Sequence, residues 1–192
     1  MNICVYGASS ESIDKIYLDT AYELGSEIAK RGHTVVYGGG GNGVMGATAR
    51  GARDNGGKII GIAPSFFLVD GVLFKDCTEF VYTETMRERK KILEERSDGF
   101  IIAPGGIGTF DEFFEILTLK QLERHNKPIA IFNVNGYYDH MLEMLRKTAE
   151  SNFMREKSME LFECFTDIGE MLDYIATYDE PPMDIRELKD IG

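Results

Sequence analysis

Short apolar runs alternate with longer amphipathic stretches through most of the chain, and this alternation constrains the fold more than any other feature. The predicted strands are Ile3–Tyr6, Thr34–Tyr37, Ile59–Ala63, Glu79–Tyr82, Phe100–Ala103, Ile129–Asn133 and Phe162–Phe165. The predicted helices are Ile13–Lys30, Val44–Asn55, Met86–Ser97, Phe110–Arg124, Tyr138–Glu150 and Ile168–Tyr178. Strands that alternate with helices connect through right-handed crossovers. We therefore expect a three-layer α/β fold, in which helices cover both faces of a mostly parallel sheet of about seven strands.

The size and charge of the chain limit its organisation and its partners. The 192 residues can form a full core, and we expect residues 1–192 to be a single domain with a short acidic tail from about Asp179. The net charge of −11 argues against binding to DNA, RNA or an anionic membrane, because those surfaces are also negative. An anionic substrate must therefore be bound by local positive features.

The cysteines and the N-terminal sequence favour a cytoplasmic protein. Cys4, Cys77 and Cys164 are far apart and lack the spacing of a metal site, so we expect buried thiols in a reducing compartment and no bound metal. The segment that starts at Met1 has no charged leader, which argues against a signal peptide. No apolar stretch reaches the length of a membrane span.

The segment Pro104–Glu112 contains a glycine-rich loop between a predicted strand and a predicted helix. A loop in this position presents free main-chain N–H groups and the positive end of a helix dipole, and both attract anions. We expect Glu112 to lie in the first turn of the helix, close to the bound anion. A phosphate beside a carboxylate suggests chemistry on a phosphorylated sugar.

A second glycine-rich loop, Gly38–Gly46, follows the predicted strand Thr34–Tyr37 and opens a helix. Its G-x-G-x-x-G pattern is weak evidence for a dinucleotide site when it stands alone. A dinucleotide fold places this pattern after the first strand and an acidic residue about 20 positions later, and neither condition is met here. The loop is either a tight turn or a cradle for a phosphate or nucleotide. Four consecutive glycines favour the cradle, and we expect it to share one site with the first loop.

A cation lies on the apolar side of the predicted helix Met86–Ser97. Arg89 is three residues before Ile92 and four before Leu93, so all three share one face. A buried cation needs an anionic partner or a ligand, although a snorkelling arginine or a structural ion pair is the alternative. We favour a functional role for Arg89 and expect the neighbouring Lys90 to support the same anion.

Glu112 also has a purely structural interpretation. If Thr109 is the N-cap, Glu112 occupies the third helical position and closes a capping box. Thr85 and Glu88 have the same spacing at the start of the preceding helix. For Glu112 the preceding glycine loop favours a functional role.

The predicted helix Phe110–Arg124 is apolar on almost every side. Such a helix is buried, and one face of a sheet cannot cover its full width. A subunit interface is the simplest cover, so we expect a homodimer. The segment Pro64–Asp76 has no clear periodicity; it is either a mobile flap or a packed loop, and we favour the packed loop.

Several motifs make the chain similar to the LOG (Lonely Guy) family, whose members are often labelled lysine decarboxylases. The family motif PGGxGTxxE matches Pro104–Glu112, and GGGxxGLMG matches the loop that ends in Gly43–Gly46, with valine in place of leucine. The motif MHxRK matches Met86–Lys90, with Arg87 in place of histidine. A weaker match lies in Gly7–Ser10, and the resemblance extends over nearly the whole chain.

This resemblance implies a Rossmann-like fold, a homodimer and hydrolysis of the N-glycosidic bond of a nucleoside 5′-monophosphate. The family's usual substrates are cytokinin riboside monophosphates, bacterial members also cleave AMP, and the products are a free base and ribose 5-phosphate. The essential arginine and glutamate of the family correspond to Arg89 and Glu112. We expect no cofactor. The residues expected to bind substrate are Gly7, Ser9, Gly39, Gly40, Gly43, Met86, Lys90, Gly105, Gly106, Gly108 and Thr109.

Two rival functions stay open at this point. A non-catalytic nucleotide-binding or sensing protein of the same fold would bind AMP without releasing its base. A decarboxylase would need pyridoxal phosphate on a lysine, and no lysine in the sequence is singled out for that role. The change to Arg87 leaves the preferred base open.

Overall fold

The computed structural model describes residues 1–68, 71–179 and 188. Its strands are β1 (Asn2–Tyr6), β2 (Thr34–Tyr37), β3 (Lys58–Pro64), β4 (Glu79–Thr83), β5 (Gly99–Ile102), β6 (Ile129–Phe132) and β7 (Glu163–Phe165). Its α-helices are α1 (Lys15–Lys30), α2 (Gly43–Asp54), α3 (Met86–Glu95), α4 (Ile107–Gln121), α5 (Asp139–Glu150) and α6 (Ile168–Thr177). Short 3₁₀ turns occupy Ser65–Phe67, Val134–Gly136 and Glu156–Leu161. The order of strands and helices confirms the predicted α/β alternation.

The seven strands form one sheet in the order β4-β3-β2-β1-β5-β6-β7, and each neighbouring pair is parallel. The chain moves outward from β1 to β4 and then returns to place β5 on the other side of β1. This reversal is a topological switch point, where the loops after β1 and β5 diverge and leave a crevice at the carboxyl edge of the sheet. Both glycine-rich loops lie at that edge, because one follows β2 and the other follows β5.

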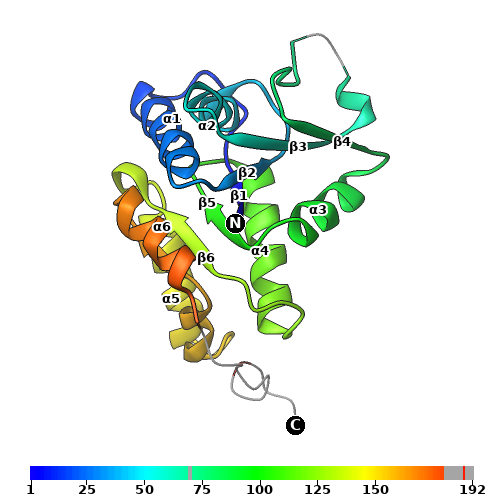
Figure 1. Ribbon diagram of the computed structural model, residues 1–192. Coiled ribbons are helices and arrows are strands. Elements are labelled where there is room, and N and C mark those ends of the chain that lie inside the picture. Colours follow the sequence, from blue (N-terminus) through cyan, green and yellow to red (C-terminus); the bar gives the residue numbers. More distant parts are fainter. Residues whose placement is uncertain (69–70, 180–187, 189–192) are drawn as a thin grey trace.

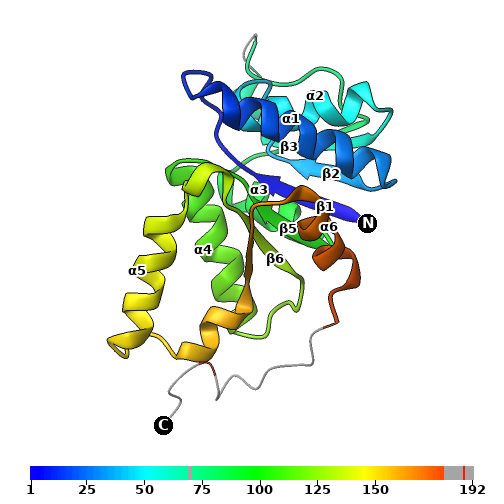
Figure 2. The same cartoon turned by 90° about the vertical axis from the view of Figure 1, so that its left-hand side faces the viewer.

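Side chains along the strands point alternately into two apolar cores, one on each face of the sheet. On β1, Ile3 and Val5 pack with the buried faces of α1, α2 and α6, whereas Cys4 and Tyr6 pack with those of α3, α4 and α5. The helices accordingly cover both faces, as Figures 1 and 2 show from two directions. In Figure 2, α4 and α5 lie on one side of β6 and α6 lies on the other.

Two sequence-based expectations about loops and thiols were wrong in part. In the segment Pro64–Asp76, the side chain of Phe74 is buried, but Phe66 is 58% and Leu68 is 61% exposed, so the first half of the segment is not packed. Cys164 is exposed rather than buried, because it lies on β7 at the edge of the sheet. The predicted acidic tail lies outside the described residues except for Asp179 and Leu188, and no described helix is long and apolar enough to cross a membrane.

Candidate active site

A cavity of about 630 Å³ opens at the carboxyl edge of the sheet. Its walls come from the loops after β1, β2, β3 and β5 and from the N-terminal parts of α2, α3 and α4, so it lies at the switch point of the sheet. This volume is within the range of pockets that bind small molecules, roughly 300–1,000 Å³. Arg89, Thr109 and Glu112 all contribute to its lining.

One wall of the cavity is the N-terminal end of α4, which begins three residues earlier than predicted. Gly106 is the N-cap in an extended conformation, and its carbonyl accepts the first helical bond from the N–H of Phe110 at 3.0 Å. The N–H groups of Ile107, Gly108 and Thr109 therefore have no partner within the helix. These three residues all line the cavity, so the helix end presents donors and a positive dipole to an anion.

The earlier helix start overturns the capping-box interpretation of Glu112. Because Gly106 is the N-cap, Thr109 occupies the third helical position and Glu112 lies in the second turn, not the first. The α4 N-cap has no side-chain hydrogen bond. The equivalent motif on α3 does form: the Thr85 hydroxyl accepts from the N–H of Glu88 at 3.1 Å, and the Glu88 carboxylate accepts from the neighbouring N–H of Glu84 at 2.9 Å.

Glu112 is instead paired with Arg89 at the floor of the cavity. Nη1 of Arg89 donates to Oε1 of Glu112 at 2.7 Å, and Nε of Arg89 donates to the carbonyl of Ile62 at 3.2 Å. The two charged side chains are only 8% and 9% exposed. Among the described contacts, Oε2 of Glu112 has no protein donor, so it can bind a substrate hydroxyl or a water molecule.

Burial raises the pKa of the Glu112 carboxyl above its ordinary value, and the positive charge of Arg89 opposes that effect. Lys90 lies on the other side of the pair, outside the cavity lining, where its ammonium bonds to Asp111 at 3.0 Å and to Glu115. Lys90 thus joins α3 to α4 and neutralises the carboxylates on both sides of Glu112.

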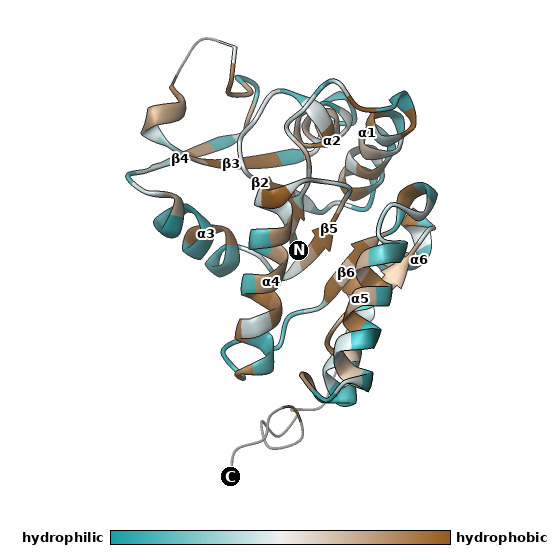
Figure 3. Ribbon diagram, turned by 180° about the vertical axis from the view of Figure 1, so that it is seen from behind, coloured by the Kyte–Doolittle hydropathy of each residue, from teal (hydrophilic) through white to brown (hydrophobic). Residues whose placement is uncertain are grey.

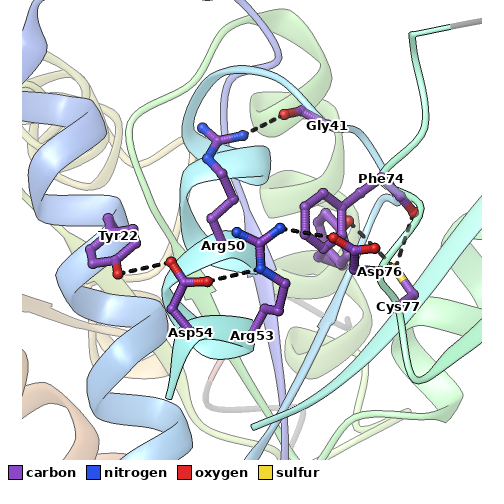
Figure 4. A network of polar contacts seen from close by, with 9 residues as sticks. Tyr22, Gly41, Arg50, Arg53, Asp54, Phe74, Asp76 and Cys77 are labelled. Carbon is purple, nitrogen blue, oxygen red and sulfur yellow. Dashed lines mark hydrogen bonds and ion pairs between the residues drawn. The ribbon is translucent and has the colours of Figure 1, made fainter. Parts of the chain in front are cut away.

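Close contacts between loops require glycine beside the buried arginine. A Cβ atom on Gly38 would lie 2.1 Å from Nη2 of Arg89, so a larger residue would displace the guanidinium. The loops after β1, β2 and β5 are also joined by main-chain bonds, since Met45 N–H donates to the carbonyl of Ala8 and Ala8 N–H donates to that of Pro104. Figure 4 shows a further bond that supports the second glycine loop, from Arg50 to the carbonyl of Gly41 at 2.7 Å.

The structure brings most of the predicted site residues together and leaves four out of the cavity lining. Those that line it are Gly7, Ser9, Gly40, Met86, Arg89, Gly106, Gly108, Thr109 and Glu112. Those outside the lining are Gly39, Gly43, Lys90 and Gly105. The three glycines allow close contact between the loop backbone and its neighbours. A Cβ on Gly43 would lie 2.5 Å from the carbonyl oxygen of Ala8, and one on Gly105 would meet the Thr109 hydroxyl. Arg87, which stands in the position of the family histidine, is exposed and does not line the cavity.

The sequence interpretation missed the apolar half of the cavity. Met45, Phe67, Val72 and Leu73 line this half, and Ile107 stands at its rim with its side chain 86% exposed. Three of these side chains come from the segment that had no periodicity. The sequence did contain one signal for this half: three neighbouring apolar residues, starting at Phe66, stand in a segment without strand or helix periodicity. Apolar side chains that no strand or helix buries in the core are typical of a binding surface.

Comparison with known proteins identifies the family. The family model described as "Possible lysine decarboxylase" matches residues 45–175. The chain is also 33% identical over 187 residues to the probable cytokinin riboside 5'-monophosphate phosphoribohydrolase LOGL5 of Oryza sativa subsp. japonica, covering 97% of this chain and 76% of that protein. The chain belongs to the LOG family. Cytokinin riboside 5'-monophosphate phosphoribohydrolase LOG3 of Arabidopsis thaliana is 34% identical, with coverage of 92% of this chain and 82% of LOG3.

Solved structures show the same fold at lower identity. The molybdenum cofactor carrier protein of Chlamydomonas reinhardtii superposes with a TM-score of 0.70 at 22% identity, covering 91% of this chain and 95% of that protein. The molybdenum cofactor binding protein of Rippkaea orientalis superposes with a TM-score of 0.67 at 23% identity, covering 92% of this chain and 94% of that protein. These similarities establish that the LOG-family chain has a Rossmann-type α/β fold.

The residues of the cavity do not fit the decarboxylase chemistry that the family label suggests. Pyridoxal phosphate reacts through a lysine amine. The described lining of the cavity contains no lysine, and the nearby Lys90 is engaged by Asp111 and Glu115 outside it. In the part of the chain that the structure describes, no three His, Cys, Asp or Glu side chains gather as metal ligands would.

Proposed function

We propose that this protein hydrolyses the N-glycosidic bond of nucleoside 5′-monophosphates, either cytokinin riboside monophosphates, AMP or both, and releases a free base and ribose 5-phosphate. One observation carries the proposal: a buried carboxylate, Glu112, opens into the same cavity as the free N–H groups at the start of α4. A phosphorylated sugar matches this combination of groups. The names of the related LOG proteins from rice and Arabidopsis, cytokinin riboside 5'-monophosphate phosphoribohydrolases, agree with it.

In the proposed reaction, the phosphate binds the N–H groups of Gly106–Thr109 and the ribose lies above Glu112. The oxygen of a water molecule forms a bond to C1′ while the bond from C1′ to the base nitrogen breaks; the attacking water gives up one proton, and the departing base takes up one, so the products are ribose 5-phosphate with a hydroxyl at C1′ and the neutral base. Positive charge develops at C1′ as that bond breaks, and a carboxylate nearby stabilises it. The free Oε2 atom of Glu112 would hold the ribose hydroxyls or orient the water.

Arg89 would act through Glu112. Its Nη1 is already bonded to Oε1 of Glu112, and its Nε is bonded to the Ile62 carbonyl. The arginine therefore keeps the buried carboxylate ionised and fixes its orientation. The base would then occupy the apolar half of the cavity, beside Met45 and Leu73.

The direct test is to incubate the protein with AMP and, separately, with isopentenyladenosine monophosphate and to measure base and ribose 5-phosphate by chromatography. Equal amounts of the two products are expected. Binding of either nucleotide without product would favour the sensing protein instead. The ratio of kcat/KM for the two substrates would establish which base is preferred.

The activity should fall in acid with an apparent pKa above the ordinary glutamate value of about 4.3. The reason is that burial raises the pKa of Glu112 and only its ionised form can stabilise positive charge at C1′. The measurement is kcat/KM against pH, since kcat/KM reports the ionisable groups of the free enzyme. A carboxyl whose pKa is higher in the folded state than in the unfolded state stabilises the folded state at low pH. That contribution to the free energy of unfolding is lost as the pH rises through the raised pKa, so protonation of Glu112 should not unfold the protein in acid. An acid limb at or below the ordinary value would contradict this assignment.

We also propose that the protein is a homodimer that covers the exposed side of α4. Phe113, Ile116 and Leu117 are buried within the protomer, but Phe110 and Phe114 are only half-buried and Ile107 is exposed. Bands of hydrophobic residues along α4 are visible in Figure 3. Sedimentation velocity should give twice the protomer mass of 21.6 kDa, and a stable monomer at micromolar concentration would contradict the proposal.

A reducing compartment, the cytoplasm, is the proposed location. Cys4, Cys77 and Cys164 are all free thiols, and Cys164 is exposed. An exposed free thiol is typical of proteins that stay in a reducing environment.

A further inference from the structure

Two adjacent tyrosines contact the anion-binding loop from the side away from the cavity. The hydroxyl of Tyr137 donates to the carbonyl of Gly105 at 2.7 Å, and that of Tyr138 donates to the carbonyl of Ala103 at 2.7 Å. The carbonyl of Pro104, which lies between them, accepts from the N–H of Ala8 at 3.0 Å. Three successive carbonyls of the loop are therefore held, while neither tyrosine lines the cavity.

The bond from Tyr137 determines the direction of a main-chain donor, the N–H of Gly106. In a planar trans peptide the C=O and N–H bonds point in opposite directions, and the described chain contains no cis peptide. The carbonyl of Gly105 points toward Tyr137, so the N–H of Gly106 in the same peptide points away from it, and Gly106 lines the cavity. Without the hydroxyl, the paired glycines Gly105 and Gly106 could rotate this peptide at little steric cost.

The tyrosines are themselves held in place by the turn before α5. Oδ1 of Asn133 accepts from the N–H of Tyr138 at 2.7 Å, and Nδ2 of Asn133 donates to Asp139 at 2.7 Å. The two rings meet edge to face with centroids 4.9 Å apart, and the Tyr137 ring makes a similar contact with Tyr17 of α1 at 5.7 Å. Burial raises the pKa of the Tyr138 phenol, so this hydroxyl stays protonated and keeps donating.

We propose that Tyr137 and Tyr138 are positioning residues that orient the Pro104–Gly106 loop for the phosphate of the substrate. The inference rests on the proposed function in one respect, the identity of the anion. A loop that is already oriented loses less conformational entropy when the anion binds, so the tyrosines raise affinity for the phosphate without touching it.

The test is the variant Tyr137→Phe, which removes one hydroxyl and keeps the ring contacts. Isothermal titration should be run with the two expected products, ribose 5-phosphate and adenine, because neither can be hydrolysed further. We expect the Kd of ribose 5-phosphate to rise about 3- to 10-fold, the loss that corresponds to one hydrogen bond, and the Kd of adenine to stay unchanged. The double variant with Tyr138→Phe should weaken phosphate binding further.

The matched control is Tyr22→Phe. The hydroxyl of Tyr22 donates to Asp54 at 3.0 Å on the surface of α1 (Figure 4), and neither residue lines the cavity, so its removal should change neither Kd. An equal loss of affinity for both ligands in Tyr137→Phe, or no loss for either, would overturn the inference. Absence of ribose 5-phosphate binding by the wild type would overturn the inference, while the proposed function would still be decided by product release from AMP. Binding by the wild type without hydrolysis of any nucleotide would overturn only the proposed function.

Discussion

Replacing Glu112 by glutamine is expected to lower kcat by a factor of about 10³, within the range for loss of one charged catalytic group. Glutamine keeps the shape of the side chain, and its carbonyl oxygen can still accept the bond from Nη1 of Arg89. It carries no negative charge, so it cannot stabilise the positive charge that develops at C1′. The measurement is product release from AMP or isopentenyladenosine monophosphate, with ribose 5-phosphate affinity measured in parallel.

The matched control for this variant is Glu79→Gln. Glu79 also pairs with an arginine, Arg96, at 2.7 Å, but the pair lies on the surface, far from full burial. Its loss should leave kcat unchanged and alter the free energy of unfolding by no more than about 1 kcal/mol. If Glu112→Gln keeps more than a tenth of the wild-type kcat, the carboxylate is not the group that acts at C1′. If Glu112→Gln lowers the affinity for ribose 5-phosphate and leaves kcat unchanged, Glu112 has a role in binding instead.

Replacing Arg89 by methionine is expected to lower the free energy of unfolding by about 3–5 kcal/mol at neutral pH, and to lower activity as well. The variant leaves the carboxylate of Glu112 buried without its countercharge, which is more costly than loss of the hydrogen bond alone. The double variant Arg89→Met/Glu112→Gln removes both charges and should recover part of the lost stability. Urea unfolding of the wild type, both single variants and the double variant measures the coupling.

The pH dependence of stability provides a second measurement on Arg89→Met. Without the arginine, the pKa of Glu112 in the folded state should rise further. The burial that raises this pKa remains, whereas the positive charge that lowers it is gone. The contribution of such a group to stability is present at low pH and is lost as the pH rises through the raised pKa. The stability deficit of the variant should therefore shrink on acidification. A deficit that is independent of pH, or no larger than that of the surface variant Arg96→Met, would contradict a buried ion pair.

The architecture of the sheet could be predicted because it depends on local patterns. The apolar runs, such as Phe100–Ala103, are short and uninterrupted, as expected of strands that are covered on both faces. Helix limits were less accurate where glycine obscures them. At α4 the threonine-based capping motif suggested a start after Thr109, whereas the extended conformation of Gly106 begins the helix three residues earlier. A glycine offers no side-chain signal for a cap, so this difference could not be detected from the residues.

The candidate site was predictable to the extent that its residues lie within continuous motifs. The glycine loops and the positions of Arg89 and Glu112 were found in this way, and burial of Arg89 followed from its place on an apolar helix face. The apolar wall was missed because Phe67 and Leu73 belong to a segment with neither strand nor helix periodicity. Their role depends on where the loop after β3 folds, and no local pattern records that.

The sequence by itself determined a parallel α/β sheet, two glycine-rich loops at one edge of it, and a cation on a face that should be buried. These properties follow from hydrophobic periodicity and from the conformations that glycine allows, which act over a few residues. Only the tertiary structure decided that Arg89 is the partner of Glu112, 23 residues away, and that two tyrosines from the turn before α5 bond to the glycine-rich loop after β5. Such pairings depend on the order of strands in the sheet, because that order places β5 beside β1 and brings distant loops within hydrogen-bonding distance.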